Sequence, residues 1–285
     1  MTTRTGSGNW SDLYEYQRVE TAQPATKPHR SMLLQAYKVG RHLEAMGVGC
    51  VPRVLHYSDT DVDAYHVLVT SALGPSLNEL LRFCGNQLSL RTVMQLTLRI
   101  LRSLQSLHEQ GAVHGAISPS NIVMGTGGSM ADTFLINFAH SRFFKDPKTH
   151  RPTTTTSSLS VGNKPKNQEL VSFASTFVQR GCTPAPRDDI ISLGYVLCYL
   201  VHGGLPWIKD DKLNPDQVVV AKNQYLETIA KQPPIQLHYF LRTAYAMKQG
   251  ELHDVPYLCN LIQRLMVDRG WKDEGDYDWT GRAVF

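Results

Sequence analysis

Residues 189–202, DIISLGYVLCYLVH, are apolar on nearly every side, and this limits the possible folds more than any other feature of the sequence. Such a helix has to be buried all round, so other helices must surround it. The stretch 90–110 supplies one, because its apolar residues recur at spacings of three and four. These residues are Val93, Leu96, Ile100, Leu101, Leu104 and Leu107. Ser89 is expected to cap the start of this helix and Gly111 to end it.

The remainder of the chain divides into two parts. From Leu77 onward the pattern is mainly helical, with further helices expected at 237–247 and 256–267. The earlier residues predict a helix over 31–45. Strands are expected at 11–20, 51–55 and 64–70.

Two breaks punctuate this early part. The polar run 58–63, SDTDVD, is expected to be a turn between two strands, and Gly74 and Pro75 favour a hinge near 71–76. The sequence therefore predicts an α+β fold, with a small strand-rich lobe at 1–73 and a larger helical lobe at 74–285.

Composition excludes several classes of protein. No apolar run is long enough to span a membrane, and the N-terminus lacks the apolar core of a secretory signal. The five cysteines are scattered and never occur in CxxC spacing, so neither a zinc site nor a disulfide framework is expected. Reduced thiols favour a cytoplasmic or nuclear protein. The formal net charge of +4 does not by itself indicate nucleic-acid binding.

Most of the positive charge lies in one place, the basic segment, which we define as residues 142–166. It contains six Lys or Arg residues and one Asp, a local sum of +5. The six are Arg142, Lys145, Lys148, Arg151, Lys164 and Lys166. The segment is either a solvated loop or a docking site for an acidic or phosphorylated protein partner. The polar run 151–160 within it is either a phosphorylation site or an unmodified spacer.

Two neighbouring motifs, VHGAISPSNIVMG (113–125) and FLINFAHSRFF (134–144), point to a family. They resemble the catalytic loop and the magnesium-binding segment of eukaryotic protein kinases. Three further stretches, at 73–81, 186–207 and 268–279, are similar to the casein kinase 1 superfamily, which includes the vaccinia-related and tau-tubulin kinases. The resemblance runs from about Tyr16 to the last residue and implies a bilobal kinase fold.

The matching catalytic positions carry no charge in this sequence. Ala116 matches the carboxylate that orients the substrate hydroxyl, and Ser118 matches the catalytic-loop lysine. Asn137 matches the aspartate that binds magnesium, and an amide oxygen is a poorer ligand for that cation. Asn121 keeps the identity of the second magnesium ligand.

Two other residues of these motifs match structural positions of the family. The resemblance implies that Asp189, at the start of a buried helix, braces the backbone of the catalytic loop. His114, like Asn121, is expected to hydrogen-bond within the loop rather than to take part in the reaction.

The small lobe departs from the family in a similar way. Arg18 stands where the family has a phosphate-binding lysine, and the helix position of its glutamate partner falls near Ala36. Tyr16 is expected to obstruct the adenine site. Only nine residues separate Gly8 from Arg18, which at about 3.3 Å per residue form one strand and little else. GSG at 6–8 is therefore favoured as a hairpin turn, with a phosphate loop as the alternative.

These substitutions lead to the expectation of a pseudokinase. Such a protein would not be an enzyme, would bind neither ATP nor a metal or other cofactor, and would regulate or scaffold a protein partner, another kinase among the candidates. No nucleic acid or membrane partner is expected. Two alternatives stay open: an atypical Ser/Thr kinase with displaced catalytic groups, for which nothing in the spacing of Lys38 or Asp132 argues, and a nucleotide sensor without catalysis.

Overall fold

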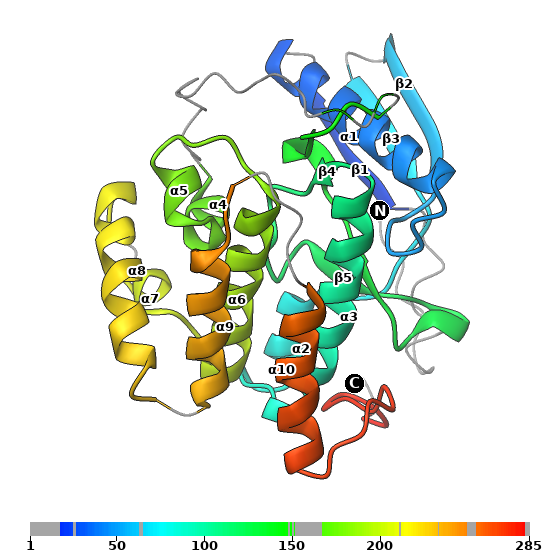
Figure 1. The fold of residues 1–285 in the computed structure, drawn as a ribbon. Helices are drawn as coiled ribbons and strands as arrows, with labels where there is room; N and C mark the ends of the chain where they lie inside the picture. The colour runs from blue at the N-terminus through cyan, green and yellow to red at the C-terminus, as the bar shows by residue number, and fades with distance from the viewer. Residues whose placement is uncertain are drawn as a thin grey trace.

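The structure is a computed structural model that describes residues 18–24, 27–62, 65–147, 149, 151, 167–210, 212–232, 234–249 and 255–282 (Figure 1). For residues 18–24, 27–31, 59–62 and 65 it describes the backbone alone. The chain has the α+β architecture that the sequence predicts, with the sheet in the first quarter and helices in most of the remainder.

A three-stranded antiparallel sheet forms the smaller part. Its strands are β1 (Arg18–Pro24), β2 (Val54–Val62) and β3 (Tyr65–Thr70), in the order β1-β3-β2. The helix α1 (Lys27–Ala45) packs against β2 and β3 through buried Val39 and Leu43. Residues 71–75 then lead without regular structure into the helical part, where the hinge is expected.

Two details of this part correct the sequence-based expectations. The turn expected at 58–63 is wrong, because β2 continues to Val62 and pairs with β3 as far as Tyr65. The first described strand begins at Arg18 and extends to Pro24, beyond the expected end at Glu20. Residues 1–17, with the GSG motif, the expected hairpin and Tyr16, lie outside the described residues.

Long helices make up the larger part. They are α3 (Leu90–Glu109), α6 (Pro186–His202), α8 (Pro215–Ile229), α9 (Ile235–Ala246) and α10 (Val255–Asp268). The short helices are α2 (Leu77–Phe83), α4 (Gln168–Phe173), α5 (Thr176–Gln179) and α7 (Pro206–Lys209). None of the described helices is long and apolar enough to cross a membrane.

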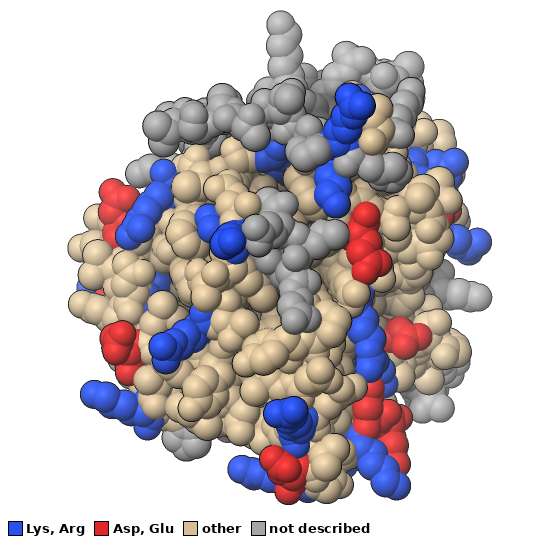
Figure 2. All heavy atoms as spheres, in the orientation of Figure 1, with Lys and Arg blue, Asp and Glu red and all other residues tan. Residues whose placement is uncertain are grey.

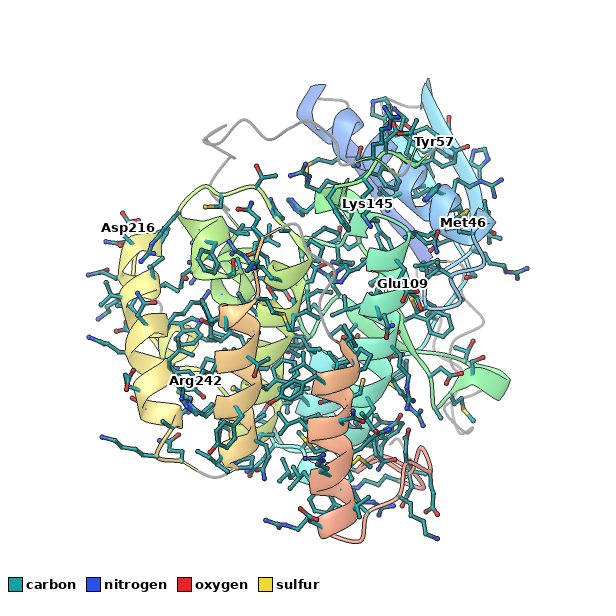
Figure 3. All side chains as sticks on the ribbon, in the orientation of Figure 1. Met46, Tyr57, Glu109, Lys145, Asp216 and Arg242 are labelled. Carbon is teal, nitrogen blue, oxygen red and sulfur yellow. The ribbon has the colours of Figure 1, made fainter. Side chains whose placement is uncertain are left out.

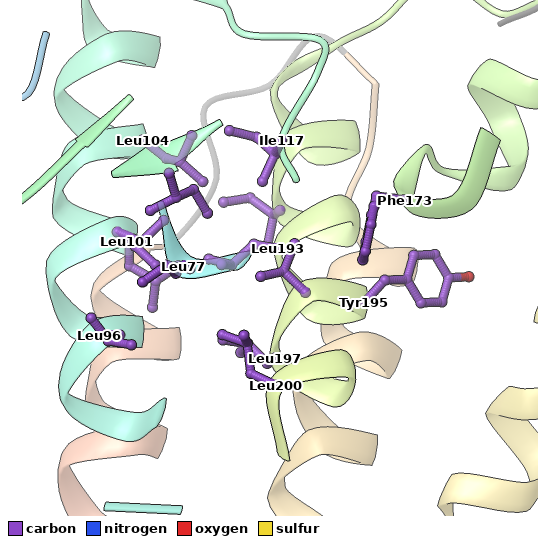
Figure 4. Packing of buried hydrophobic residues seen from close by; sticks show 14 of the residues in the cluster. Leu77, Leu96, Leu101, Leu104, Ile117, Phe173, Leu193, Tyr195, Leu197 and Leu200 are labelled. Carbon is purple, nitrogen blue, oxygen red and sulfur yellow. The ribbon is translucent and has the colours of Figure 1, made fainter. Parts of the chain in front are cut away.

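The helix α6 occupies the centre, as its all-round apolar sequence predicts, and contacts α3 on one side and α9 on another. Leu193 and Leu197 of α6 face Leu101 and Leu104 of α3 in the core shown in Figure 4. Truncating such a buried leucine to alanine costs about 2–5 kcal/mol. A Cβ at Gly194 would lie 2.5 Å from the Leu241 side chain, so this glycine permits the close approach of α6 and α9.

A lysine is buried in this core. Lys222 of α8 is fully inaccessible, and its ammonium group donates hydrogen bonds to the carbonyl oxygens of Val171 (2.8 Å) and Ala174 (2.6 Å) and to Gln179 Oε1 (3.0 Å). It also lies 4.9 Å from the ring centroid of Tyr195. Burial lowers the pKa of Lys222 well below its usual value.

Short strands between α3 and α4 carry the motifs. β4 (Ala112–Val113) pairs with β7 (Arg142–Phe143), and β5 (Ile122–Met124) pairs with β6 (Thr133–Leu135). The single-turn helices η2 (Gly127–Ser129) and η3 (Phe138–His140) lie between these strands. This arrangement brings the two kinase-like motifs side by side.

Candidate active site

The loop at 113–121 is braced from below by Asp189, which is only 1% exposed at the start of α6. Its carboxylate accepts hydrogen bonds from the backbone N–H groups of His114 and Gly115, each at 2.8 Å. His108 Nε2 lies 2.9 Å from the same carboxylate. The structure thus places Asp189 in the bracing position that the family resemblance implies.

His114 ties the loop to the second motif. Its Nδ1 accepts a hydrogen bond from Ala116 N (3.2 Å), so the proton sits on Nε2, which donates to Ile136 O (3.0 Å). Ser141 Oγ donates to His114 O at 2.9 Å. Burial lowers the pKa of the His114 imidazole, which favours the neutral ring that these contacts require. We call His108, His114, Ser141 and Asp189 the bracing groups.

Four other residues match the family's catalytic groups, and we call them the catalytic positions: Ala116, Ser118, Asn121 and Asn137. Ala116 and Ser118 are buried, at 4% and 1% exposure. The Ser118 hydroxyl has no hydrogen-bond partner among the described residues. Neither side chain carries a charge or a proton acceptor of carboxylate strength, so neither can act as a strong general base.

The two asparagines contact each other. Asn121 Nδ2 donates to Ala116 O at 2.8 Å, and Asn137 Nδ2 donates to Asn121 Oδ1 at 3.3 Å. Asn137 has left-handed backbone angles (φ 66°, ψ 63°), which asparagine tolerates better than most residues. The pair is neutral, and Asn121 Oδ1, the atom that a metal ion would use, already accepts this one hydrogen bond.

Metal binding at this site therefore depends on two amide oxygens. No group of three or more His, Cys, Asp or Glu side chains in the described part of the chain is placed to hold a metal ion. Mg²⁺ prefers carboxylate and phosphate oxygens. Asn121 and Asn137 fit this cation only weakly, as a supplement to the phosphates of a nucleotide.

Behind Asn137 lies a cavity of about 10 Å³ that Ala36 of α1 lines together with Leu68 and Thr70 of β3. Ala36 is buried and offers no carboxylate there. The Arg18 backbone pairs with Thr70 at the start of β1, so Arg18 lies on the strand next to this cavity, but its side chain is outside the described set. The expected obstruction by Tyr16 also lies outside that set.

The structure describes three of the six basic residues of the basic segment. Arg142 is half-buried in β7, and burial lowers the pKa of its guanidinium. Lys145 stands above the end of α3, where Figure 3 also labels Glu109, and Arg151 accepts a backbone hydrogen bond from Asp146 N (2.8 Å). Lys148, Lys164 and Lys166 lie outside the described residues. Figure 2 shows the face of the molecule seen in Figure 1, and the Lys and Arg side chains of the described residues are scattered over it.

Several hydrogen bonds at the site were not predicted from the sequence. Ser141 and His108 were not predicted as bracing groups, because neither belongs to a short motif with the loop. The need for glycine at position 115 is likewise visible only in the structure, where its φ is 74° and a Cβ built there would lie 2.7 Å from His140 O.

The fold and this site together define a protein-kinase-like protein. No family model matches the sequence. The chain is 30% identical over 298 aligned positions, 97% of its own length, to Casein kinase I homolog 3 of Schizosaccharomyces pombe (strain 972 / ATCC 24843). It spans 64% of the length of that protein. The similarity supports a casein kinase 1-like kinase fold for the chain.

The same similarity corrects one prediction. The expectation that the protein is not an enzyme is wrong, because a curated casein kinase I homologue that matches most of the chain points to a protein kinase. The expectation rested on the neutral residues at the catalytic positions and on Arg18, Ala36 and Tyr16 of the small lobe.

Proposed function

We propose that this protein is an atypical Ser/Thr protein kinase of the casein kinase 1 type, with slow phosphoryl transfer. The observation that carries the proposal is the similarity to a casein kinase I homologue along 97% of the chain. The bracing of the loop by Asp189 supports it, because a loop held in this way keeps Asn121 next to Asn137.

Slow transfer follows from the chemistry of the reaction. Phosphoryl transfer passes through a loose transition state that needs mainly positioning and charge stabilisation from the enzyme. Loss of a general base costs about 10²–10⁴-fold in rate, which reduces turnover without abolishing it. Two neutral amide ligands bind Mg²⁺ weakly, so the activity should require a high concentration of magnesium.

The test is phosphate incorporation into casein as a generic acceptor, measured across a magnesium titration. The wild-type chain should label the acceptor slowly, and Asn121→Ala should abolish the labelling. Asn223→Ala, which alters an exposed asparagine of α8, serves as the matched control and should leave the rate unchanged. Labelling that never exceeds background, or that survives Asn121→Ala, would contradict the proposal.

Nucleotide binding gives a second test, because the sequence predicts none and the proposed activity requires it. A ligand at 100 times its Kd stabilises the folded state by about 2.7 kcal/mol. A magnesium-dependent rise in Tm with ATP supports the kinase proposal. An unchanged Tm at millimolar Mg-ATP supports the sequence-based expectation instead.

A protein partner is the second part of the proposal. The basic segment carries +5 of charge within 25 residues of sequence, which favours an acidic or phosphorylated protein segment that the kinase-like chain binds and regulates or scaffolds. Such contacts act mainly on the association rate and are screened within about 8–10 Å at physiological salt.

Once such a partner has been captured, serine should replace five basic residues together: Lys145, Lys148, Arg151, Lys164 and Lys166. Binding should weaken and lose most of its salt dependence, with Tm nearly unchanged. The control replaces five exposed basic residues in or just after α8, α9 and α10, namely Lys231, Arg242, Arg264, Arg269 and Lys272. Equal affinity in both variants would show that the partner binds elsewhere.

A further inference from the structure

A cavity of about 710 Å³ lies behind the hinge, away from the catalytic positions. Its walls come from the hinge at Gly74 and Pro75, from α2 and β5, from the connection between β5 and β6, and from the C-terminal residues 275–282, red in Figure 1. This volume is within the range of about 300–1,000 Å³ that is typical of small-molecule sites. The proposed kinase function makes no use of it.

One wall is aromatic and held in place. The rings of Tyr277 and Trp279 stack with centroids 4.9 Å apart and an angle of 28° between their planes. The Tyr277 hydroxyl donates to Ala131 O and accepts from Arg99 Nε, both at 2.7 Å. Because both partners are fixed in the fold, the wall is formed before any ligand arrives.

Another part of the lining is apolar and equally fixed. Met124 of β5 and Leu80 of α2 line it, and both are buried. Gly74 N donates to Met124 O (2.8 Å), and Met124 N donates to Pro75 O (2.9 Å), so the hinge and β5 hold each other. An apolar slot between these residues and the aromatic pair suits a flat ring.

The rim stays open because it carries glycines. A Cβ built on Gly127, Gly128 or Gly281 meets no atom within 4 Å. Gly128 is also free of a left-handed φ, so it can accept a side chain without backbone strain. A large residue at Gly128, which lines the cavity, would therefore enter open space without a clash at its Cβ.

Charge at the mouth decides the class of ligand. Arg282 is the one charged residue among those that line the cavity, and its side chain is exposed. It takes part in none of the ion pairs found among the described residues. We infer that this cavity binds a small planar aromatic anion, with its ring against Trp279 and its negative group at Arg282.

The test uses naphthalene-2-carboxylate as the probe, with its neutral carboxamide for comparison, in isothermal titration calorimetry of the full chain. The wild type should bind one equivalent of the carboxylate, about tenfold more tightly than the carboxamide. Arg282→Gln should remove that preference. Gly128→Trp should abolish binding of both probes. If this variant does not fold, Gly128→Leu replaces it and should weaken the binding of both probes.

Matched controls come from a second cavity of about 480 Å³ that Gly49 and Arg53 line. Gly49 likewise has open space around a built Cβ. Gly49→Trp and Arg53→Gln should leave affinity and stoichiometry unchanged. Binding of several equivalents, an equal loss in the control variants, or binding that survives both Gly128 variants would overturn the inference. None of these outcomes depends on kinase activity.

Discussion

The bracing groups and the catalytic positions lie in or around the same loop, 113–121, yet they differ in charge. Asp189 keeps its carboxylate and satisfies two backbone N–H groups and His108. Ala116, Ser118 and Asn137 are neutral where the family has charged residues. The carboxylate that holds the backbone of the loop is therefore retained, while the charged groups that would take part in the reaction are absent.

The difference has a physical reason. Removing a buried carboxylate leaves backbone donors without acceptors and a histidine without a partner, and each such group costs free energy. Replacing an Asp or Lys at a catalytic position by a neutral residue removes a desolvated charge and leaves no backbone group unpaired. The fold resists the first kind of change and tolerates the second.

The largest expected effect is on stability at Asp189. Asp189→Ala should lower the free energy of unfolding by about 3–5 kcal/mol, because it breaks a buried, hydrogen-bonded charge cluster. Urea denaturation monitored by circular dichroism measures this. Asp268→Ala, at an exposed aspartate at the end of α10, should stay within about 0.5 kcal/mol. Similar losses in both variants would remove the distinction between the two sets of residues.

The next effect is on rate. The double variant Ala116→Asp with Asn137→Asp supplies a base and an anionic metal ligand, and should raise phosphate incorporation by about 100-fold or more. Ala116→Asp alone should achieve much less, because such groups act as a unit. A double variant no faster than the wild type would show that another part of the site limits the reaction.

A smaller effect is expected at Gly115. Gly115→Ala places a Cβ on a left-handed residue, 2.7 Å from His140 O, and should destabilise the fold by about 1–3 kcal/mol. Gly49→Ala, where a Cβ meets nothing and the backbone is unstrained, is the control and should be nearly neutral. Equal Tm values for these variants would argue against a tightly held loop.

The smallest effect is a pH dependence from His114. Its pKa is below the usual value in the folded state, so the unfolded chain binds the proton more readily. The stabilisation is complete above about pH 6.5, the ordinary histidine pKa, and decreases as the pH falls toward the folded pKa, by at most about 1.4 kcal/mol per pH unit. Denaturation at pH 7.5 and 5.5 should show a smaller loss for His114→Gln than for the wild type. His140, whose pKa burial also lowers, remains in both.

The sequence predicted those parts of the fold whose signals are local. The stripe of α3 and its cap at Ser89 are confirmed, since Ser89 Oγ accepts a hydrogen bond from Thr92 N at 3.2 Å. Helix α8 was missed although Asn214, Pro215 and Gln217 form a capping box with proline at the first position, because its apolar residues are not confined to one face.

What the sequence could not supply were the contacts between distant segments. β2 contains residues 58–62 of the polar run that predicts a turn, and its pairing with β3 makes this stretch a strand. At the site, the sequence was enough to match Ala116, Asn121 and Asn137 to the catalytic positions. The hydrogen bond between the two asparagines could not be predicted, because it depends on two loops that meet in space. The same holds for His108 beside Asp189.

Lys222 bears on how the chain reaches this structure. Its ammonium group finds its three oxygen acceptors only when α8 and residues 171–179 are both in place, and without them it would be a cation buried without compensation. The two segments therefore dock together or not at all. They form one cooperative unit of folding, and their amide hydrogens should become exposed to exchange in the same opening event.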